Sequence, residues 1–387
     1  MLKVKTLNNI SDKGLAHLPG DLFSVGDDIE DPDAILLRSF KMHDMELPTS
    51  LKAVGRAGAG VNNIPVEKMS KLGIPVFNAP GANANAVKEL VIAALLLAAR
   101  NICQAWDYTR NLEGEDAELH KQVEAGKKQY AGFELPGRTL GVVGLGAIGR
   151  YVANAALELG MKVIGFDPGI TVEGAWQLSA DVKKAGSIEE LLRNVDFVTF
   201  HVPLIDATRD MINADSIKIM RDGATILNFA REGIVNDQAV VDAIKDGKIH
   251  AYVCDFPSNI LKGQDRVIAL PHLGASTGEA EENCAVMVAE QVKDFLLHGN
   301  IKNSVNFPEV NSPQETEYRV VIANDNVPKM LGSISNVMAD AGLNIHDMVN
   351  KSRGDLAYTV VDCDSQIPDD VVAKLSQIEG VLSVRVI

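Results

Sequence analysis

The stretch Thr139-Leu-Gly-Val-Val-Gly144-Leu-Gly146-Ala-Ile-Gly149 decides the fold of this chain. It begins with a short apolar run typical of a buried parallel strand, and a glycine-rich turn follows at once and leads into a helical pattern. The turn has the spacing G-x-G-x-x-G. A lone match to that spacing is weak evidence, but a strand before it and a helix after it are the context that a dinucleotide-binding site requires.

Each glycine of this turn has its own expected task. Gly144 would allow the tight turn, Gly146 the close approach of the backbone to a pyrophosphate, and Gly149 the packing of the helix on the strand. The amino end of the helix would offer unpaired N–H groups and a positive dipole to the phosphates. The residue types therefore predict a dinucleotide cofactor.

Asp167 indicates which dinucleotide the chain binds. It ends the next apolar run, eighteen positions after Gly149, where a carboxylate can accept hydrogen bonds from both ribose hydroxyls. A carboxylate would repel a 2′-phosphate, so the sequence predicts NAD and not NADP. The alternative is that Asp167 is only a turn residue before Pro168.

Strand and helix patterns alternate on both sides of this stretch. Apolar runs lie at 34–38, 53–56 and 75–78 before it and at 162–166, 197–200, 225–228, 251–254 and 266–270 after it. Such alternation indicates doubly wound parallel sheets, and therefore two α/β domains. One long apolar helix is expected over 86–108, a polar solvated segment over 111–129 and an amphipathic helix over 279–298.

The composition limits the alternatives. A chain of 387 residues exceeds one hydrophobic core, and its net charge of −15 disfavours nucleic acids and anionic membranes as partners. The four cysteines are widely spaced without a C-x-x-C pair, so neither a metal site nor a disulfide framework is expected. The first residues read as a strand and not as a signal peptide, which predicts a cytosolic location.

Two downstream segments carry candidate catalytic groups. Asn-Phe-Ala-Arg231-Glu-Gly and Pro-His272-Leu-Gly-Ala each follow a predicted strand, and open α/β sheets bind ligands at the carboxyl ends of their strands. An arginine can hold a carboxylate through a bidentate fork, and a histidine can accept a proton near neutral pH. Alone, either residue would be read as a surface ion pair or a satisfied histidine, but together they indicate a site.

These segments, with the glycine-rich turn and Asp255, resemble the D-isomer-specific 2-hydroxyacid dehydrogenases over nearly the whole chain. The resemblance implies that the protein oxidises the hydroxyl of a D-2-hydroxy acid with NAD. His272 would accept the hydroxyl proton, and Arg231 would hold the substrate carboxylate and polarise the developing carbonyl. The alternatives are a glyoxylate or hydroxypyruvate reductase on the same fold and a non-catalytic, NAD-sensing regulator.

The resemblance also assigns binding residues. For the cofactor it implies contacts from Ala147 and Ile148 to the pyrophosphate, from Val202 to the adenosine portion, from Asp255 to the nicotinamide carboxamide, and from Phe229, Ala230, His272, Gly274 and Ala275 to the nicotinamide side. Within the family, Val-Gly-Arg56-Ala57-Gly58-Ala59-Gly60 resembles the members with a phosphate-bearing substrate. The amides of Ala57 to Gly60 would then cradle the substrate carboxylate, and Arg38 and Arg56 would bind its phosphate with help from Ser39, Lys41 and Asn83.

One position departs from the family pattern. The family places a glutamate 29 residues after the arginine, where it holds the catalytic histidine, and this count from Arg231 leads to Ile260. An imidazolium at His272 therefore lacks its usual charged partner. Ser258 or Asn259 is expected to supply a neutral hydrogen bond instead, with Asp265 as a more distant charged candidate.

The resemblance divides the chain into three domains. It implies a flavodoxin-like substrate-binding domain at 1–98 and 278–305 and a Rossmann-like domain at 99–277. A proline-containing linker at 306–316 follows, and the order β-α-β-β-α-β from 317 to 387 indicates a ferredoxin-like fold. This last segment resembles ACT domains, which implies serine as an effector or, alternatively, a purely structural role, and a homodimer or homotetramer. The family's glycine is replaced by Lys329.

Overall fold

The computed structural model describes residues 1–387, which form two compact units. The first unit comprises Met1–Asn83 and Gly278–Ile387, and the second comprises Ala84–Thr277. The chain therefore passes between the units at 83/84, whereas the sequence places a domain boundary at 98/99; the three-domain division stays a prediction. None of the helices combines the length and the hydropathy that a membrane span requires.

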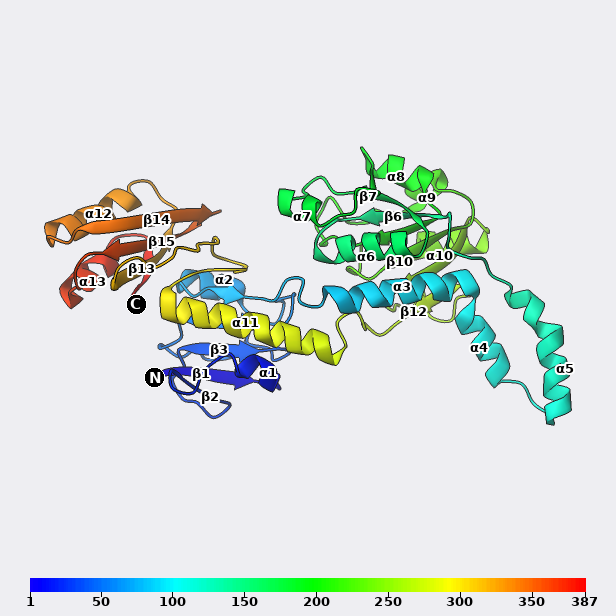
Figure 1. Ribbon diagram of the computed structural model, residues 1–387, viewed down its shortest axis with the longest axis horizontal. Coiled ribbons are helices and arrows are strands. Elements are labelled where there is room, and N and C mark those ends of the chain that lie inside the picture. Colours follow the sequence, from blue (N-terminus) through cyan, green and yellow to red (C-terminus); the bar gives the residue numbers. More distant parts are fainter. The chain divides into compact units, whose positions relative to one another are not determined.

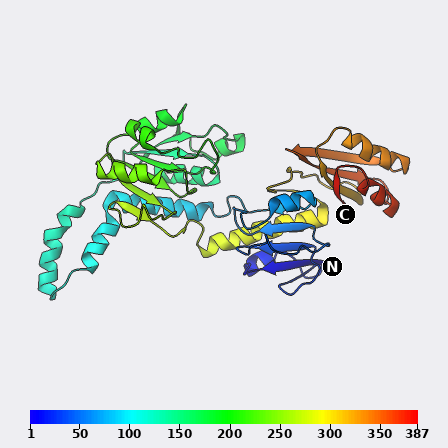
Figure 2. The same cartoon turned by 180° about the vertical axis from the view of Figure 1, so that it is seen from behind.

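The first unit contains a parallel sheet with the strand order β2-β1-β3-β4-β5. Its strands are β1 (Leu2–Leu7), β2 (Phe23–Gly26), β3 (Ala34–Leu37), β4 (Ala53–Arg56) and β5 (Val76–Phe77). The helices α1 (Asp12–Leu15) and α11 (Gly278–His298) cover one face, and α2 (Val66–Lys71) covers the other (Figures 1 and 2). All of β3 is buried because both of its faces are covered, as its unbroken apolar sequence predicts.

The second unit contains a seven-stranded parallel sheet with the order β12-β11-β10-β9-β6-β7-β8. Its strands are β6 (Thr139–Val143), β7 (Lys162–Phe166), β8 (Lys183–Lys184), β9 (Phe197–Phe200), β10 (Ala224–Asn228), β11 (Ile249–Cys254) and β12 (Val267–Ala269). The helices α3 (Ala84–Arg100) and α6 (Ala147–Glu158) cover one face. The other face is covered by α8 (Ile188–Asn194), α9 (Ala214–Ile219) and α10 (Asp237–Lys245), and the short α7 (Val172–Trp176) follows β7.

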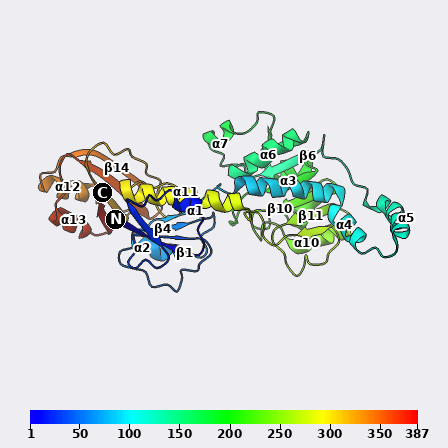
Figure 3. The same ribbon diagram turned by 60° about the horizontal axis from the view of Figure 1, so that its bottom comes forward.

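The expected single helix over 86–108 is wrong, because α3 ends at Arg100 and α4 (Ile102–Arg110) begins in a new direction. Asn101 between them has a left-handed backbone with φ of 51°, and its Oδ1 accepts a hydrogen bond from Arg266 at 3.2 Å. Asparagine adopts this conformation more readily than other non-glycine residues. The segment expected to be polar and solvated contains α5 (Asp116–Gly126) and the turn η1 (Lys127–Tyr130). Figure 3 shows α4 and α5 projecting from their unit as one arm.

The C-terminal segment forms a four-stranded antiparallel sheet with the order β14-β15-β13-β16. It consists of β13 (Tyr318–Asp325), α12 (Met330–Asp340), β14 (Ile345–Arg353), β15 (Leu356–Cys363), α13 (Asp369–Ser376) and β16 (Val381–Val386). Both helices pack on one face of this sheet, and the other face joins the hydrophobic core of α11. Two parallel α/β sheets and a ferredoxin-like domain confirm the fold class expected from the sequence.

The segment 306–316 is more than a connecting linker. Phe307 and Val310 are fully buried, and Val310 exchanges backbone hydrogen bonds with Ile301. The buried Asn306 accepts a hydrogen bond from the Val76 amide at 2.9 Å and donates one to the carbonyl of Ile74 at 3.0 Å. These contacts fasten the segment to the edge of the first sheet.

Candidate active site

The glycine-rich turn has the geometry that its sequence predicts. It leaves β6 at Gly144, whose φ of 87° suits glycine, and a Cβ there would lie 2.5 Å from the carbonyl oxygen of His201. A Cβ on Gly149 would lie 1.9 Å from the Gly144 oxygen, so the helix could not pack on the strand. A Cβ on Gly146 would meet nothing within 4 Å. Gly146 therefore keeps an open space at the amino end of α6, which fits a pyrophosphate.

Asp167 follows β7 and is bound to the turn itself. Its Oδ2 accepts a hydrogen bond from the Leu145 amide at 2.7 Å, and its Oδ1 accepts one from the Gly169 amide at 2.8 Å. Each carboxylate oxygen can accept further hydrogen bonds, so a ribose hydroxyl can still bind there. Val202, which follows β9, contacts the position of Gly144 from the neighbouring strand.

Asp255 supports the loop that carries His272. The side chain is 1% exposed, and its two oxygens accept hydrogen bonds from the amides of Leu273 at 2.8 Å and Gly274 at 2.7 Å. His272 has a left-handed backbone with φ of 56°, a strained conformation for a residue other than glycine. A buried carboxylate thus holds His272 in place, a positioning role that the sequence does not reveal.

Arg231 lies beyond β10 in a turn that Asn228 organises. The Asn228 amide group donates to the Arg231 carbonyl at 2.9 Å, and its Oδ1 accepts from the Ala230 amide at 3.2 Å. The guanidinium is exposed and folds back onto the carbonyl of Ala230 at 2.6 Å, while Phe229 and Ala230 are buried beneath it. No hydrogen bond joins the side chains of Arg231 and His272.

The predicted cofactor and catalytic residues all leave one edge of the second sheet. His272, Asp255 and Arg231 follow the neighbouring strands β12, β11 and β10, and Val202, Gly144 and Asp167 follow β9, β6 and β7. Because the strands are parallel, these six carboxyl ends lie side by side in that order. The edge therefore combines a dinucleotide cradle with a histidine and an arginine at one end of it.

None of the expected substitutes for the missing glutamate forms a hydrogen bond with His272. The hydroxyl of Ser258 donates to Asp237 at 2.6 Å, and its oxygen accepts a hydrogen bond from the Leu261 amide at 3.4 Å. Asp265 precedes β12 and His272 follows it, so the two side chains lie at opposite ends of that strand. Phe256 instead packs against the imidazole of His272, with ring centroids 5.1 Å apart in an edge-on arrangement. No hydrogen bond joins Asn259 to His272.

His201 is a second histidine near the turn, and its environment excludes it as a proton acceptor. Burial lowers the pKa of His201 to about 3, and its Nε2 lies 3.1 Å from the hydroxyl of Thr199 while its Nδ1 has no hydrogen-bond partner. The ring is therefore neutral at physiological pH. His272, by contrast, is exposed to solvent at the carboxyl edge.

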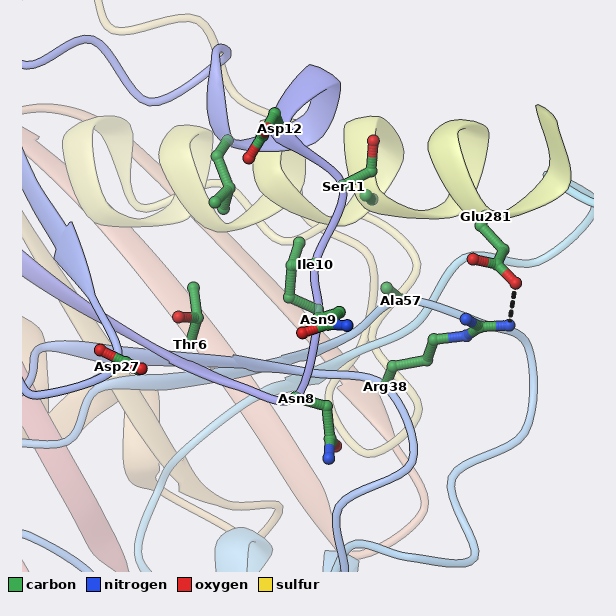
Figure 4. A pocket seen from close by; sticks show the side chains of 12 residues that line it. Thr6, Asn8, Asn9, Ile10, Ser11, Asp12, Asp27, Arg38, Ala57 and Glu281 are labelled. Atoms are coloured by element: carbon green, nitrogen blue, oxygen red, sulfur yellow. Dashed lines mark ion pairs between the residues drawn. The ribbon is translucent and has the colours of Figure 1, made fainter. Parts of the chain in front are cut away.

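The first unit carries the predicted substrate-binding residues at the carboxyl edge of its own sheet. Arg38 follows β3, Arg56 ends β4, and the Nε of Arg56 donates to the Arg38 carbonyl at 3.1 Å. Arg38 forms an ion pair of 2.6 Å with Glu281 of α11 (Figure 4). Ser39 is exposed in the following loop, and Asn83 is the last residue before the passage to the second unit.

The expected cradle of four amides is partly occupied. The Ala57 amide donates to the Leu37 carbonyl and the Gly58 amide to the Arg56 carbonyl, both at 2.8 Å. These two N–H groups are already satisfied by the protein, so only those of Ala59 and Gly60 are available to a carboxylate.

Two asparagines that the sequence analysis does not single out hold these loops. Asn63 donates to the carbonyls of Arg38 at 3.1 Å and Phe40 at 2.7 Å, and Asn78 donates to the carbonyl of Ala59 at 2.6 Å. Their position after an apolar strand or inside a turn motif is the one signal in the sequence that could have indicated them.

The chain is similar to known proteins over most of its length. The family model described as the NAD-binding domain of D-isomer specific 2-hydroxyacid dehydrogenases matches residues 92–274. A D-3-phosphoglycerate dehydrogenase of Methanocaldococcus jannaschii is 37% identical over 86% of this chain, which spans 62% of that relative. The protein of the same name from Haemophilus influenzae is 34% identical over 89% of this chain and 83% of its own.

The chain belongs to the D-isomer specific 2-hydroxyacid dehydrogenase family. A solved structure described as an NAD⁺-bound 3-phosphoglycerate dehydrogenase of Entamoeba histolytica has the same fold, with a TM-score of 0.60 and 26% identity over 79% of this chain and 98% of that one. As a member of the 2-hydroxyacid dehydrogenase family, the chain binds NAD, and the open space at Gly146 and the carboxylate of Asp167 fit that cofactor.

Proposed function

We infer that the protein oxidises D-3-phosphoglycerate to 3-phosphooxypyruvate with NAD⁺, the reaction that opens L-serine biosynthesis. The ordered row of residues at the carboxyl edge of the second sheet carries this inference, because it sets His272 and Arg231 beside a dinucleotide cradle. The similarity to D-3-phosphoglycerate dehydrogenases over most of the chain supports the choice of substrate.

The roles of the residues follow from the proton and charge that the reaction moves. NAD, held at the amino end of α6 and by Asp167, would supply the acceptor for the hydride of C2. A ring nitrogen of His272 accepts the hydroxyl proton, and Asp255 keeps the His272 loop in place for that transfer. Arg231 holds the α-carboxylate and stabilises the negative charge that develops on the carbonyl oxygen.

The first unit carries its own cations and donors for an anionic ligand. Arg38 and Arg56 are linked to each other through the Arg38 carbonyl, and the amides of Ala59 and Gly60 are available to a carboxylate. Ser39 and Asn83 add neutral donors from loops of the same unit. This set of groups favours an acid with two anionic ends.

The test is NADH-linked absorbance with D-3-phosphoglycerate and with D-glycerate, on the wild type, His272→Ala and His346→Ala. We expect His272→Ala to lower kcat/KM by about 10²–10⁴ because it removes the general base, with the Kd for NAD unchanged. His346 is exposed on β14 of the C-terminal sheet and serves as the matched control.

Three results would change the assignment. A loss of less than twofold in His272→Ala would remove His272 from the mechanism. Equal rates on both substrates would favour the glyoxylate or hydroxypyruvate reductase. Binding of NAD by the wild type without turnover of any 2-hydroxy acid would select the NAD-sensing regulator.

We also propose a homo-oligomer, either a dimer or a tetramer, that assembles through the α4–α5 arm. No residue of α4 is buried, and Trp106, Ile102 and Val123 expose apolar surface on the arm. Exposed apolar side chains gathered on a projecting arm indicate a surface that a partner covers. A second copy of the chain is the partner that cyclic symmetry provides most simply.

Serine as an effector of the C-terminal domain and a cytosolic location complete the proposal. Asn326 and Lys329 lie before α12 in the segment that resembles ACT domains, and all four cysteines are free thiols, which suits a reducing compartment. A serine titration that changes neither the rate nor the melting temperature would exclude the effector.

A further inference from the structure

Arg38, the expected phosphate ligand, already has an anionic partner within the chain. Its guanidinium lies 2.6 Å from the carboxylate of Glu281, which extends from the first turn of α11 toward the end of β3 (Figure 4). Both side chains are partly exposed, at 38% for Arg38 and 43% for Glu281. An anionic ligand can therefore reach this pair, and it must compete with Glu281 for the guanidinium.

The pair lies at the rim of a pocket of about 550 Å³ at the carboxyl ends of β1 and β3. Arg38 is the one cation in its lining, which also contains the carboxylates of Asp12, Asp27 and Glu281. The strand order reverses between β1 and β3, where open α/β sheets bind ligands. On the pocket side, the carboxylates around Arg38 therefore repel anions, and only the Arg38 guanidinium attracts them.

Arg56 and Cys284 belong to the same electrostatic cluster. Burial raises the pKa of the Cys284 thiol, the charges of Arg56 and Arg38 oppose this shift, and Glu281 reinforces it. The charges of both guanidinium groups and of the Glu281 carboxylate thus act on the pKa of this one thiol. At 2.6 Å from Arg38, the carboxylate of Glu281 reduces the positive potential that this guanidinium offers to a substrate phosphate.

We propose that Glu281 competes with the far end of the substrate for Arg38, an inference that rests on the proposed function. A phosphate or a carboxylate at that end must displace the carboxylate of Glu281 from the guanidinium, whereas a hydroxyl leaves the pair intact. Glu281 therefore lowers the affinity for both anionic ends by the same factor and limits how strongly Arg38 favours a charged end over a neutral one. A phosphate still binds better than a carboxylate, because it carries more negative charge and three acceptor oxygens.

The strength of the pair suits such competition. An ion pair between partly exposed side chains is weak, so an anionic end displaces it at the cost of a factor of about two to five in affinity. A buried and fully paired arginine would not open for a substrate. A free arginine would bind both kinds of anionic end more tightly.

A purely structural role for Glu281 predicts something different. An acidic residue in the first turn of a helix stabilises the helix dipole, and Glu279 and Glu281 both stand in that turn. Glu281→Asp separates the two roles, because it keeps the negative charge in the first turn but is one methylene too short to hold Arg38. Glu281→Gln removes the charge and weakens the pair.

The experiment measures kcat/KM of the full chain for D-3-phosphoglycerate, D-malate and D-glycerate, whose far ends carry a phosphate, a carboxylate and a hydroxyl. The variants are Glu281→Gln, Glu281→Asp and the control Glu282→Gln, which removes an equally short ion pair of the same helix with Lys13. We expect both Glu281 variants to raise kcat/KM about two- to fivefold for the two acids with a charged far end and to leave kcat/KM for D-glycerate unchanged.

Each other outcome overturns the inference in a recognisable way. An unchanged kcat/KM in Glu281→Gln shows that Glu281 does not affect the substrate specificity. A higher kcat/KM in Glu281→Gln with the wild-type value in Glu281→Asp shows that only the negative charge matters, and not the ion pair with Arg38. An equal rise of kcat/KM in Glu282→Gln leads to the same conclusion.

The proposed function is tested separately. If the wild type turns over none of the three acids, that function fails, and the inference is decided by the Kd for inorganic phosphate. Both Glu281 variants must then bind inorganic phosphate more tightly than the wild type and Glu282→Gln. Equal Kd values for all four proteins overturn it.

Discussion

Lys329 occupies a backbone conformation that favours glycine. It precedes α12 with φ of 72°, at the position where the sequence departs from the glycine of the resembled domains. We expect Lys329→Gly to raise the free energy of unfolding by about 0.5–1 kcal/mol, since it relieves left-handed strain that exceeds the entropy cost of glycine. Urea denaturation measures the change.

A lysine in an ordinary helix is the matched control for Lys329. Lys374 lies in α13 with helical geometry, so Lys374→Gly should lower the free energy of unfolding by about 1 kcal/mol. A loss of stability in both variants would show that the Lys329 backbone is not strained.

At the scale of single residues, the sequence predicted the groups of the site but not their partners. Gly144, Gly146 and Gly149 have distinct tasks because local backbone geometry alone dictates them. The hydrogen bonds of Asp255 to the amides of Leu273 and Gly274 span 18 and 19 positions, and no local pattern encodes them. The same holds for Ser258, whose hydroxyl donates to Asp237 at a separation of 21 positions.

The arm of α4 and α5 provides the prediction at the scale of elements. Trp106 is 62% exposed on α4, where the proposed partner would cover it. We expect Trp106→Glu to convert the oligomer into a monomer at micromolar concentration, since a charge at the centre of an apolar interface remains unpaired. Light scattering after size exclusion measures the mass.

The other tryptophan is a control for the arm. Trp176 on α7 is 84% exposed and lies outside the arm, so Trp176→Glu should leave the oligomer intact. An unchanged mass of Trp106→Glu, or a monomeric wild type, would rule out the arm as the interface.

Among the elements, the end of α3 was the feature that the sequence predicted least well. The apolar pattern over 86–108 carries no proline or glycine, so nothing local marks the break at Asn101. The break depends on Arg266 and on the carbonyls of Tyr130 and Ala131, which bind the side chain of Asn101. These partners come from distant parts of the chain and meet Asn101 only after the unit has folded.

At the scale of the whole molecule, the buried Arg319 joins the C-terminal sheet to the rest of the first unit. Arg319 of β13 binds Asp362 of β15 at 2.6 Å with both side chains inaccessible to solvent, and it donates to the carbonyls of His298, Ser312 and Pro313. The C-terminal domain is thus fastened to the end of α11 and to the segment 306–316.

We expect Arg319→Met to lower the free energy of unfolding of the first unit by about 3–5 kcal/mol, because it leaves Asp362 buried and unpaired. Hydrogen exchange should show the amides of β13 and of α11 accelerating together. The control is Lys218→Met, whose exposed pair with Asp215 contributes little. Acceleration confined to the C-terminal sheet would mean that this domain unfolds independently.

The sequence by itself determined the fold class, the place of the dinucleotide turn and the candidate catalytic pair, because strand period, glycine spacing and strand-end position are local properties of the chain. Only the tertiary structure decided that segment 306–316 is buried, that Asp255 holds the His272 loop and that Glu281 occupies Arg38. Each of these contacts joins residues far apart along the chain. The local sequence does not distinguish between the many possible partners, so the packing of the folded chain decides which of them is bound.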